Sequence, residues 1–394
     1  MANISIRPLQ GEEYIDVLFS FQMYAFRASP PFMEKEGWAN ILRQRKGVTY
    51  HVLFEDDLPV AAAANTAMTQ NVRGKLFPAG GVWGVVTLPV ARRKGYSRQV
   101  IGSLLSTVKD TGAVFSNLYP FRESFYERMG YVTHPLPIIA HISTQSLAPL
   151  LKMELDGEVE LKLMGEAYET YRSFLADLRS RVHGMTVFDF GEPAIASQNG
   201  FWVAIAKAAG EIEGMMLYKL SGEEVGKFNF RATRFYYNTQ RGRYLLLDWI
   251  ARHIDQADRA EIWLPPYEHP ETWLADLQAR IESQERAPMS RVLHVANIGG
   301  MEAGAGSFSA HVTDPLLPSN EDYWKFESVD GCLHISKTND VDCDLNIQGL
   351  TALVFGTHDP QDFSLRGWGD LTPEIQAVMR TMFPPRLPFL HEVF

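Results

Sequence analysis

Residues 81–97 read GVWGVVTLPVARRKGYS, and residues 98–105 continue as RQVIGSLL. The apolar run at the start is bounded by glycines, which predicts a strand, and Pro89 leads the chain into a basic turn. Beyond this turn, apolar residues recur at the spacing of one helix face, at Val100, Ile101, Leu104, Leu105 and Val108. The stretch therefore predicts a strand, a turn and an amphipathic helix in immediate succession.

The turn carries three successive cations, Arg92, Arg93 and Lys94, and then Gly95. The unpaired N–H groups of the first helical turn, the positive end of the helix dipole and these cations together predict a binding site for a pyrophosphate. Gly95 lets the backbone come close to such an anion. Two other phosphate loops are excluded, because the stretch contains neither G-x-x-x-x-G-K-[ST] nor G-x-G-x-x-G.

The residues RRKGYS at 92–97 resemble the acetyl-CoA signature of the GNAT N-acetyltransferases, which is R/Q-x-x-G-x-G/A after a strand. Ser97 departs from the usual Gly or Ala. In the GNAT fold this strand parts from its neighbour before the turn, and its free backbone groups pair with the pantetheine arm. The resemblance implies acetyl-CoA as cosubstrate, with cofactor-binding positions at Val85, Val86, Thr87, Arg92, Arg93, Lys94, Gly95, Tyr96 and Ser97. The alternative is a basic surface turn with ordinary packing behind it.

A second motif, FYERMGY at 125–131, resembles the F-Y-x-x-x-G-F/Y turn that ends the cofactor half of GNAT proteins. The resemblance implies that the phenol of Tyr126 faces the thioester sulfur and protonates the departing thiolate. With reference pKa values of about 10 for a phenol and about 8.5 for a thiol, we expect this transfer to need only modest tuning. The alternative is that Tyr126 is a packing aromatic of an amphipathic helix.

The composition is that of a globular protein with several domains: 394 residues, 46% hydrophobic and 21% charged, with a net charge of −10. This charge argues against a nucleic-acid partner and is compatible with cationic small substrates. Cys332 and Cys343 lack metal-binding spacing, so we expect buried thiols in a reducing compartment and no metal. With no signal-peptide pattern and no apolar run of membrane-spanning length, the sequence predicts a cytoplasmic protein without a membrane partner.

The pattern of elements predicts an α+β protein of three domains. Residues 1–140 hold the cofactor turn, and residues 141–286 repeat the order helix, antiparallel strands, helix, strand. At the corresponding turn, Thr239–Arg243 lacks the signature spacing, which predicts a degenerate second GNAT-like domain without cofactor and leaves Arg241 and Arg243 as surface charges. A boundary near residue 286 precedes a strand-rich third domain, residues 287–394.

Three units in this order, with the turn DPLLPSN at 314–320, resemble the Eis ("enhanced intracellular survival") N-acetyltransferases, whose third domain resembles sterol carrier protein 2. The resemblance covers essentially the whole chain. It implies acetyl transfer to amines of aminoglycosides or other polycationic acceptors, by a homo-oligomer that is a hexamer in the family. The alternatives are a non-catalytic CoA-binding protein and a lipid-binding module that acts through the C-terminal domain.

The family resemblance also implies a role for the chain end, because in Eis proteins the C-terminal carboxylate lies in the active site. An ammonium acceptor must lose a proton before it attacks the thioester, and the resemblance assigns this proton to the α-carboxylate of Phe394. Phe389 and Phe394 are suited to anchor the tail in a pocket. His391 and Glu392 are rival bases, and a packed or frayed tail without a catalytic role is the alternative.

Overall fold

The computed structural model describes residues 3–27, 29–191, 200–224 and 227–394. It forms two compact units. Unit 1 contains Met1–Pro135, Arg179–Gly191 and Ala287–Phe394, and unit 2 contains Leu136–Leu178 and Glu192–Arg286. Among the described residues, no helix is long and apolar enough to cross a bilayer.

The N-terminal part of unit 1 is a mixed sheet in the order β1-β2-β3-β4-β5-β15-β6, and β9 pairs with β3. Its strands are β1 Ile4–Pro8, β2 Val48–Glu55, β3 Leu58–Val72, β4 Lys75–Thr87, β5 Phe115–Leu118, β6 Val132–Thr133, β9 Thr186–Phe188 and β15 Met289–Val292. Its helices are α1 Glu13–Arg27, α2 Lys35–Arg43, α3 Tyr96–Asp110 and α4 Glu123–Glu127. The strand, turn and helix predicted from residues 81–105 are confirmed as β4 and α3.

Packing of α3 follows from its apolar stripe. The five predicted positions are all buried, and they join one core cluster with residues of β2, β3, β4 and β5.

The hairpins β2–β3 and β3–β4 both turn through residues with positive φ. These are Asp56 and Asp57 between β2 and β3, and Arg73 and Gly74 between β3 and β4. This is the geometry that matches strand twist in a two-residue hairpin.

Two strands of this sheet come from distant parts of the sequence. β15 pairs antiparallel with β5, Met289 opposite Leu118, and also with β6. β9 adds to β3, with Met68 opposite Phe188. A buried polar network ties both additions to the sheet, because the amides of Gln70 and Asn117 bond to each other at 3.1 Å, Ser290 donates to Asn117 at 2.5 Å, and Gln70 donates to the Gly184 carbonyl at 3.0 Å.

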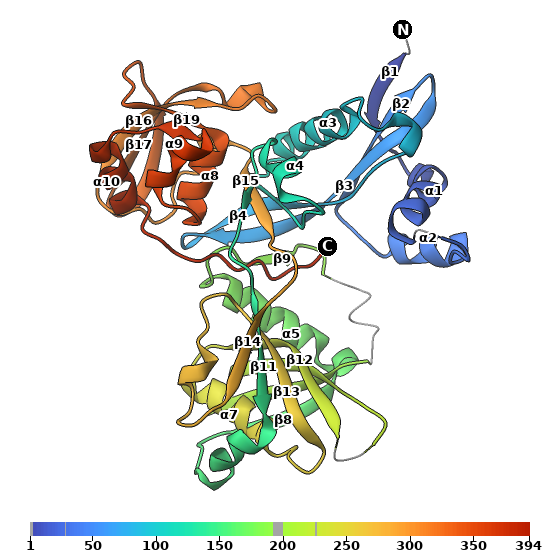
Figure 1. Cartoon of the computed structure of the whole chain (residues 1–394), viewed down its shortest axis with the longest axis vertical. Coiled ribbons are helices and arrows are strands. Elements are labelled where there is room, and N and C mark those ends of the chain that lie inside the picture. Colours follow the sequence, from blue (N-terminus) through green and yellow to red (C-terminus); the bar gives the residue numbers. More distant parts are fainter. Residues whose placement is uncertain (1–2, 28, 192–199, 225–226) are drawn as a thin grey trace. The chain divides into compact units, whose positions relative to one another are not determined.

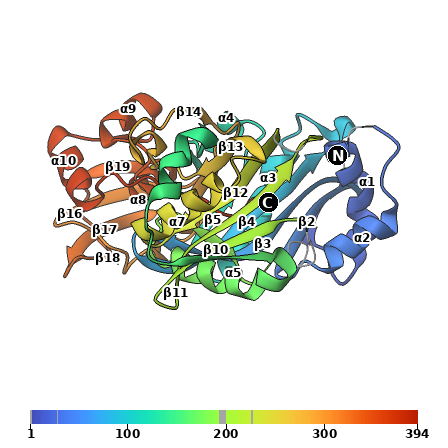
Figure 2. The ribbon, with the colours of Figure 1, turned by 90° about the horizontal axis from the view of Figure 1, so that it is seen from below.

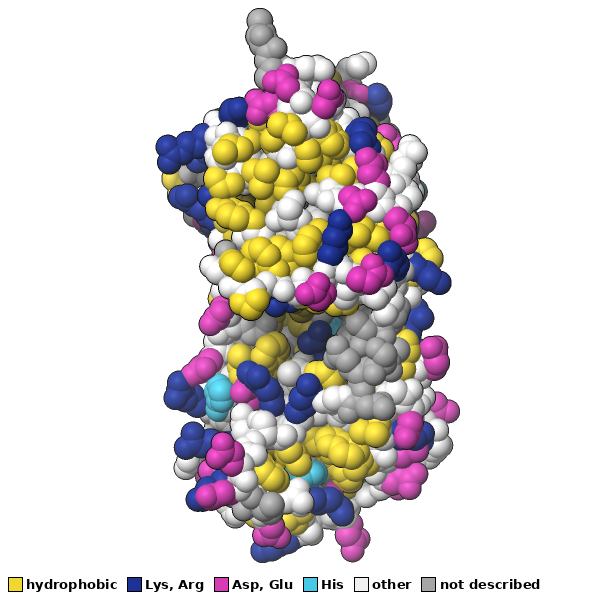
Figure 3. All heavy atoms as spheres, turned by 90° about the vertical axis from the view of Figure 1, so that its right-hand side faces the viewer, with side chains coloured by type: hydrophobic (Ala, Val, Ile, Leu, Met, Phe, Trp, Pro, Cys, Tyr) yellow, Lys and Arg dark blue, Asp and Glu magenta, His cyan; other side chains and the backbone are white. Residues whose placement is uncertain are grey.

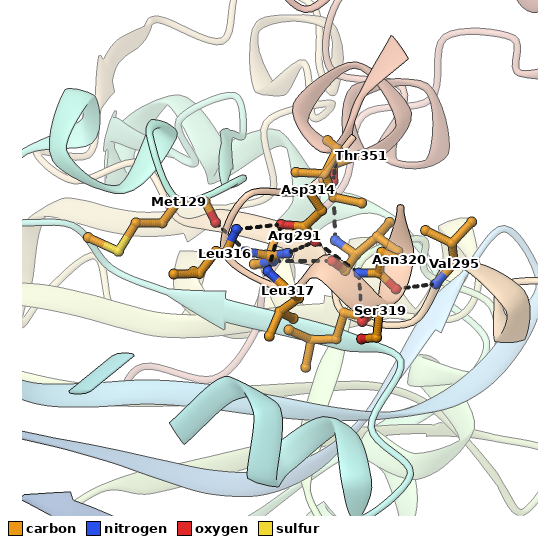
Figure 4. A network of polar contacts seen from close by, with 12 residues as sticks. Met129, Arg291, Val295, Asp314, Leu316, Leu317, Ser319, Asn320 and Thr351 are labelled. Carbon is orange, nitrogen blue, oxygen red and sulfur yellow. Dashed lines mark hydrogen bonds and ion pairs between the residues drawn. The ribbon is translucent and has the colours of Figure 1, made fainter. Parts of the chain in front are cut away.

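A fully buried ion pair joins β15 to the C-terminal part of unit 1. Nη2 of Arg291 lies 2.5 Å from Oδ2 of Asp314, and the two side chains are 0% and 1% exposed. Arg291 also donates to the Met129 carbonyl, and Asn320 donates to the same carboxylate oxygen of Asp314 at 2.9 Å (Figure 4). The turn at residues 314–320, which carried the Eis resemblance, is therefore the hub of a buried network.

The C-terminal part of unit 1 is a five-stranded sheet in the order β18-β17-β16-β19-β20. Its elements are β16 Ser307–Thr313, β17 Asp322–Val329, β18 Cys332–Lys337, β19 Cys343–Asn346, α8 Ile347–Phe355, α9 Phe363–Arg366, β20 Gly369–Asp370 and α10 Pro373–Met382. Helix α8 is apolar and buried nearly all round, and its core is continuous with Phe77 and Phe115 of the N-terminal sheet. Figures 1 and 2 show α1 and α2 at one end of unit 1 and α8, α9 and α10 at the other.

The expectation of two buried thiols is wrong for one of them. Cys343 is buried on β19, but Cys332 is exposed at the start of β18. Cys332 follows the hairpin turn at Asp330 and Gly331, both with positive φ, and this turn places the thiol at the surface.

Unit 2 contains a seven-stranded sheet in the order β14-β7-β13-β12-β11-β10-β8. Its elements are β7 Ile138–Ser143, β8 Glu158–Leu163, α5 Met164–Arg179, β10 Trp202–Ala208, β11 Glu211–Ser221, β12 Phe228–Tyr237, α7 Gln240–Ala251, β13 Ala257–Leu264 and β14 Ala279–Ser283. The neighbours β8-β10-β11-β12-β13 repeat the order β1-β2-β3-β4-β5, with one parallel pair at the end in each case. The α+β fold with a repeated first domain is as predicted.

Two buried histidines flank the ring of Phe355 in unit 1, with ring centroids 5.1 Å away for His134 and 6.1 Å away for His183. His183 accepts the Arg73 N–H at Nδ1 and donates to the Phe355 carbonyl from Nε2, so it is neutral. Both ring nitrogens of His134 lack a hydrogen-bond partner among the described residues. Burial lowers the pKa of each imidazole to about 3.

We predict that these histidines make stability fall in mild acid. In the unfolded chain these imidazoles have a pKa of about 6.5, so they bind protons below that pH, whereas in the folded chain they stay neutral. The free energy of unfolding therefore decreases as the pH falls from 6.5 towards 3. Each histidine contributes a slope of up to about 1.4 kcal/mol per pH unit. Urea unfolding between pH 7.5 and 5 measures this slope. His134→Leu should flatten it, whereas the exposed His334→Leu should not. An equally steep slope in His134→Leu contradicts the assignment.

Candidate functional site

The site begins where β4 parts from β5. The two strands pair in parallel from Ala79 opposite Phe115 only as far as Val82 opposite Leu118. Beyond that point β4 continues to Thr87 while paired with β3 alone. Gly84 has a φ of +61°, and the β3–β4 register shifts around it, so this glycine forms a bulge that bends the strand away. On the β5 side, the backbone of residues 84–87 thus forms an open strand edge within the described chain.

The open edge leads into the basic turn. A short 3₁₀ helix, Pro89–Ala91, is followed by Arg93 and Gly95, which have φ values of +65° and +81°. No described residue accepts a hydrogen bond from the backbone N–H groups of residues 93–97. A Cβ atom placed on Gly95 would meet nothing within 4 Å. Exposed N–H groups in this conformation at a helix N-terminus form a concave site for an anion.

The side chains of the turn divide into two groups. Arg92 and Arg93 are exposed, and within the described part of the chain Arg92 donates only to the Thr87 carbonyl, at 3.3 Å. Lys94 and Tyr96 both bond to Glu55 of β2 at 2.7 Å, and the ring of Tyr96 is part of the core. The arginines are therefore available to an anion, whereas Lys94 and Tyr96 fasten the turn to β2.

Ser97 has a structural partner. Its hydroxyl lies 2.7 Å from the hydroxyl of Thr87, the last residue of β4. This contact joins the end of the open edge to the first turn of α3. A Gly or Ala at position 97, as in the usual signature, could not make this bond.

Tyr126 lies on α4 with 4% of its surface exposed, in one core cluster with Val82 and Leu118. Its ring meets those of Phe121, Phe125 and Tyr131 at centroid distances of 5.7, 5.0 and 6.1 Å. Burial raises the pKa of the Tyr126 phenol above its ordinary value. The phenol is therefore protonated at neutral pH but is a weaker acid than the modest tuning predicted from the sequence assumes.

Phe394 lies beside β4, near the end of the pairing of this strand with β5. A Cβ atom on Gly81 would lie 2.9 Å from the ring of Phe394, so glycine at position 81 makes room for it. The ring also packs against Tyr119 at 5.7 Å and Phe188 at 6.2 Å between centroids. Figure 1 shows the last residues, in red, beside β9. Phe394 thus lies beside Gly81, one residue before the pairing of β4 with β5 ends, and Tyr126 belongs to the core cluster that contains Val82 and Leu118.

The corresponding turn of unit 2 is filled by its own carboxylate. Glu213 accepts from Arg241 at 2.8 Å and from the hydroxyl of Thr239 at 2.6 Å, and a Cβ on Gly242 would lie 2.3 Å from the Glu213 carbonyl oxygen. The hydrogen bond from Arg241 lowers the pKa of Glu213 to about 2. A carboxylate of the chain itself thus lies at this helix N-terminus, where a phosphate would have to bind.

Helices α1 and α2 present an apolar surface. Figure 3 shows hydrophobic side chains gathered on this side of unit 1. The exposed large ones on these helices and the loop between them are Tyr24, Phe26, Phe32 and Ile41. Four carboxylates of the same region are ion-paired, to Arg7, Lys35 or Arg43. They are those of Glu12, Glu13, Asp16 and Glu36.

Sequence comparison identifies two domains. Residues 5–133 match the family model of the acetyltransferase (GNAT) domain. The N-terminal domain is a GNAT domain. Residues 298–391 match the model of the sterol carrier protein domain. No curated protein matches the sequence significantly.

Solved structures share the fold of the whole chain. A GCN5-related N-acetyltransferase from Anabaena variabilis is 17% identical with a TM-score of 0.84, covering 98% of this chain and 99% of that one. A probable N-acyltransferase from Enterococcus faecalis, a conserved protein of unknown function, is 18% identical with a TM-score of 0.84 and full coverage of both chains. Eis1 from Mycobacterium abscessus is 17% identical with a TM-score of 0.76, also with full coverage of both. With the family-model match, they confirm the predicted fold and the prediction of a GNAT acetyltransferase of Eis-like architecture.

Several residues that shape this site were not identified from the sequence. Thr186–Phe188 of β9 and Met289–Val292 of β15 belong to the same sheet, although each follows residue 136 in the chain. These segments are only three and four residues long and show no alternation of apolar and polar residues, so the sequence does not say which sheet they join. Glu55 and Glu213 were also missed, because each meets its turn only through tertiary contacts.

We predict that Gly95→Glu weakens acetyl-CoA binding. The new side chain projects from the open turn and sets a like charge against the phosphates. Loss of one charge-assisted contact corresponds to roughly a 10- to 150-fold increase in Kd. Calorimetry with acetyl-CoA measures this change.

Gly210→Glu is the matched control for this experiment. Gly210 has a φ of +85°, close to that of Gly95, has equally open surroundings, and lies in a hairpin of unit 2. Backbone strain and added charge are therefore the same. Equal affinities of the two folded variants would show that the turn at residues 92–97 does not hold the pyrophosphate.

Proposed function

We propose that this protein transfers the acetyl group of acetyl-CoA directly to an amine of a small-molecule acceptor, in its N-terminal domain. The observation that carries the proposal is the open edge of β4 that leads into a turn with unpaired N–H groups and free arginines. The GNAT fold family uses acetyl-CoA, and these features fit its two ends, the extended pantetheine arm and the pyrophosphate. Acetyl-CoA supplies the acetyl group as a thioester.

In this proposal the residues of β4 and the turn hold the cosubstrate. The backbone of Val85 and Val86 pairs with the amides of the pantetheine arm as an added strand would. Arg92, Arg93 and the N–H groups that begin α3 bind the pyrophosphate. Thr87 and Ser97, through their mutual hydrogen bond, keep the strand edge and the turn in register.

Two groups handle protons. The amine nitrogen forms a bond to the thioester carbon, the carbon–sulfur bond breaks, and the ammonium proton passes to the α-carboxylate of Phe394, directly or through a water. The hydroxyl of Tyr126 donates to the departing thiolate sulfur. Because burial raises the pKa of this phenol, hydrogen-bond donation to the thiolate contributes more than complete proton transfer does.

The finer predictions concern the acceptor, the assembly and the location. The net charge of −10 and the fold shared with Eis1 support aminoglycosides or other polycationic amines as acceptors. The paired carboxylates and exposed aromatics of α1 and α2 give a reason to test apolar monoamines beside them. Cytoplasmic location and a homo-hexamer stay predictions.

A screen that follows thiol release from acetyl-CoA over aminoglycosides, polyamines, lysine peptides and apolar monoamines tests the proposed function directly. Binding of acetyl-CoA without turnover on any amine favours a CoA-binding protein. Binding of a fluorescent fatty acid in place of acetyl-CoA favours a lipid module.

We predict that Tyr126→Phe lowers kcat by roughly 10²–10⁴-fold while the affinity for acetyl-CoA changes little. The variant keeps the ring and its contacts with three neighbouring aromatics and removes only the hydroxyl. Steady-state kinetics and calorimetry measure the two effects. Tyr131→Phe is the control, because the Tyr131 hydroxyl is bonded to Ser116 in the core at 2.7 Å. A fully active Tyr126→Phe variant would return Tyr126 to a packing role.

We also predict that a short Gly-Ser extension after Phe394 abolishes turnover but leaves acetyl-CoA binding intact. The extension keeps every side chain and moves the negative charge of the chain end away from Gly81. The same extension at the N-terminus controls for added length. Normal turnover of the C-terminally extended protein would exclude the Phe394 carboxylate as proton acceptor.

A further inference from the structure

The tail before Phe394 lies along the segment at residues 183–188. The N–H of Phe389 donates to the His183 carbonyl at 2.9 Å, and a Cβ on Gly184 would lie 2.6 Å from Pro388. Residues 389–392 are all buried, with exposed fractions between 2% and 8%. This segment is fixed in turn, because β9 pairs with β3 and the Gly184 N–H donates to the Asn71 carbonyl at 2.7 Å. The tail is thus attached to the sheet through an intermediate strand.

Glu392 makes the last contacts of this attachment. Its Oε1 accepts the backbone N–H of Phe188 at 2.9 Å, and its own N–H donates to the hydroxyl of Thr186 at 3.4 Å. Its side chain takes the place of a strand carbonyl at the exposed edge of β9. With 4% exposure, the side chain is shielded from water, so this hydrogen bond is stronger than it would be at the surface.

The two residues that follow depend on this contact. Val393 is 60% exposed and offers little anchoring surface. Phe394 then turns back so that its ring lies over Gly81, between Tyr119 and Phe188. Glu392 therefore sits at the hinge between the buried tail and the residue that reaches the open edge of β4.

We propose that Glu392 is a positioning residue, whose side-chain hydrogen bond to the Phe188 N–H holds residue 394 at the point where β4 leaves β5. The inference rests on the proposed function, since it gives residue 394 a catalytic group to place. In this inference the buried carboxylate of Glu392 binds the backbone of β9 and does not act as the proton acceptor. Thr186 and β9 become part of the site through the same contact.

The experiment compares Glu392→Gln with Glu392→Ala. Gln keeps an oxygen that accepts the Phe188 N–H and loses the charge, whereas Ala loses the acceptor. A displacement of about 1 Å at a reacting group costs on the order of 10²-fold in rate, so kcat of Glu392→Ala should fall about 10- to 100-fold, with KM for acetyl-CoA unchanged within about twofold. Glu392→Gln should stay within about threefold of the unchanged protein in kcat. Val393→Ala is the control on the neighbouring exposed position.

Carboxypeptidase release of Phe394 gives a second readout that does not need turnover. Glu392→Ala should speed this release at least tenfold, because the tail end detaches more often, and Glu392→Gln should not. Thermal unfolding of each variant shows whether the fold is intact. Should Glu392→Ala not fold, Thr186→Val removes the second contact of Glu392 and is expected to speed release in the same direction.

The outcomes separate the inference from the proposed function. Unchanged kcat and release in Glu392→Ala overturn the positioning role. Equal loss in the Gln and Ala variants also overturns it, because it shows that the charge of Glu392 is what matters. If the unchanged protein acetylates no amine, the proposed function fails, and the release rates still decide whether Glu392 holds the tail.

Discussion

Unit 1 depends on the buried ion pair between Arg291 and Asp314. Both the guanidinium and the carboxylate are shielded from water. Removing such ions from water costs several kcal/mol each, and only complete hydrogen bonding offsets this cost. Here Asp314 accepts from the N–H groups of Leu316 and Leu317 and from Asn320, and Arg291 donates to two carbonyls. Because every bond must be present together, the strand, the turn and the loop that supply them have one allowed arrangement.

The same network contacts the segment that carries Tyr126. One of the two carbonyls belongs to Met129, three residues after Tyr126, in the turn that follows α4. The sterol-carrier-like domain therefore helps to define the turn that carries the phenol. Its own helix α8 completes the core against β15 and β6. In this chain the third domain acts as part of the scaffold of the first.

What could be predicted from the sequence was local. The strand, basic turn and helix between Gly81 and Asp110 follow from apolar periodicity and from cations beside a glycine, and the structure has them where expected. The missing cofactor site of unit 2 was visible in the spacing at Thr239–Arg243. The order of three units came from the pattern of elements along the chain, and the resemblance to Eis proteins rests on that order.

What escaped prediction depends on partners far away in the chain. Nothing in Thr186–Phe188 or Met289–Val292 indicates that these segments extend a sheet whose first strand begins far earlier in the chain, at Ile4. The weak acidity of Tyr126 arises from neighbouring rings, and the surface position of Cys332 from a hairpin turn. Glu392 was named as a rival base because it lies on the same tail as Phe394, and its contact with the Phe188 N–H depends on the fold.

The position of β15 between β5 and β6 has a consequence for synthesis of the protein. When the first 135 residues leave the ribosome, β5 is an open edge and β6 has no neighbour, because the strand that joins them is still unmade. At usual elongation rates the wait until residue 292 lasts roughly 8–30 s. During that time a nearly complete sheet exposes an unpaired strand, the kind of edge through which nascent chains associate. The chain order of the strands thus leaves the N-terminal sheet with this unpaired edge until β15 has been made.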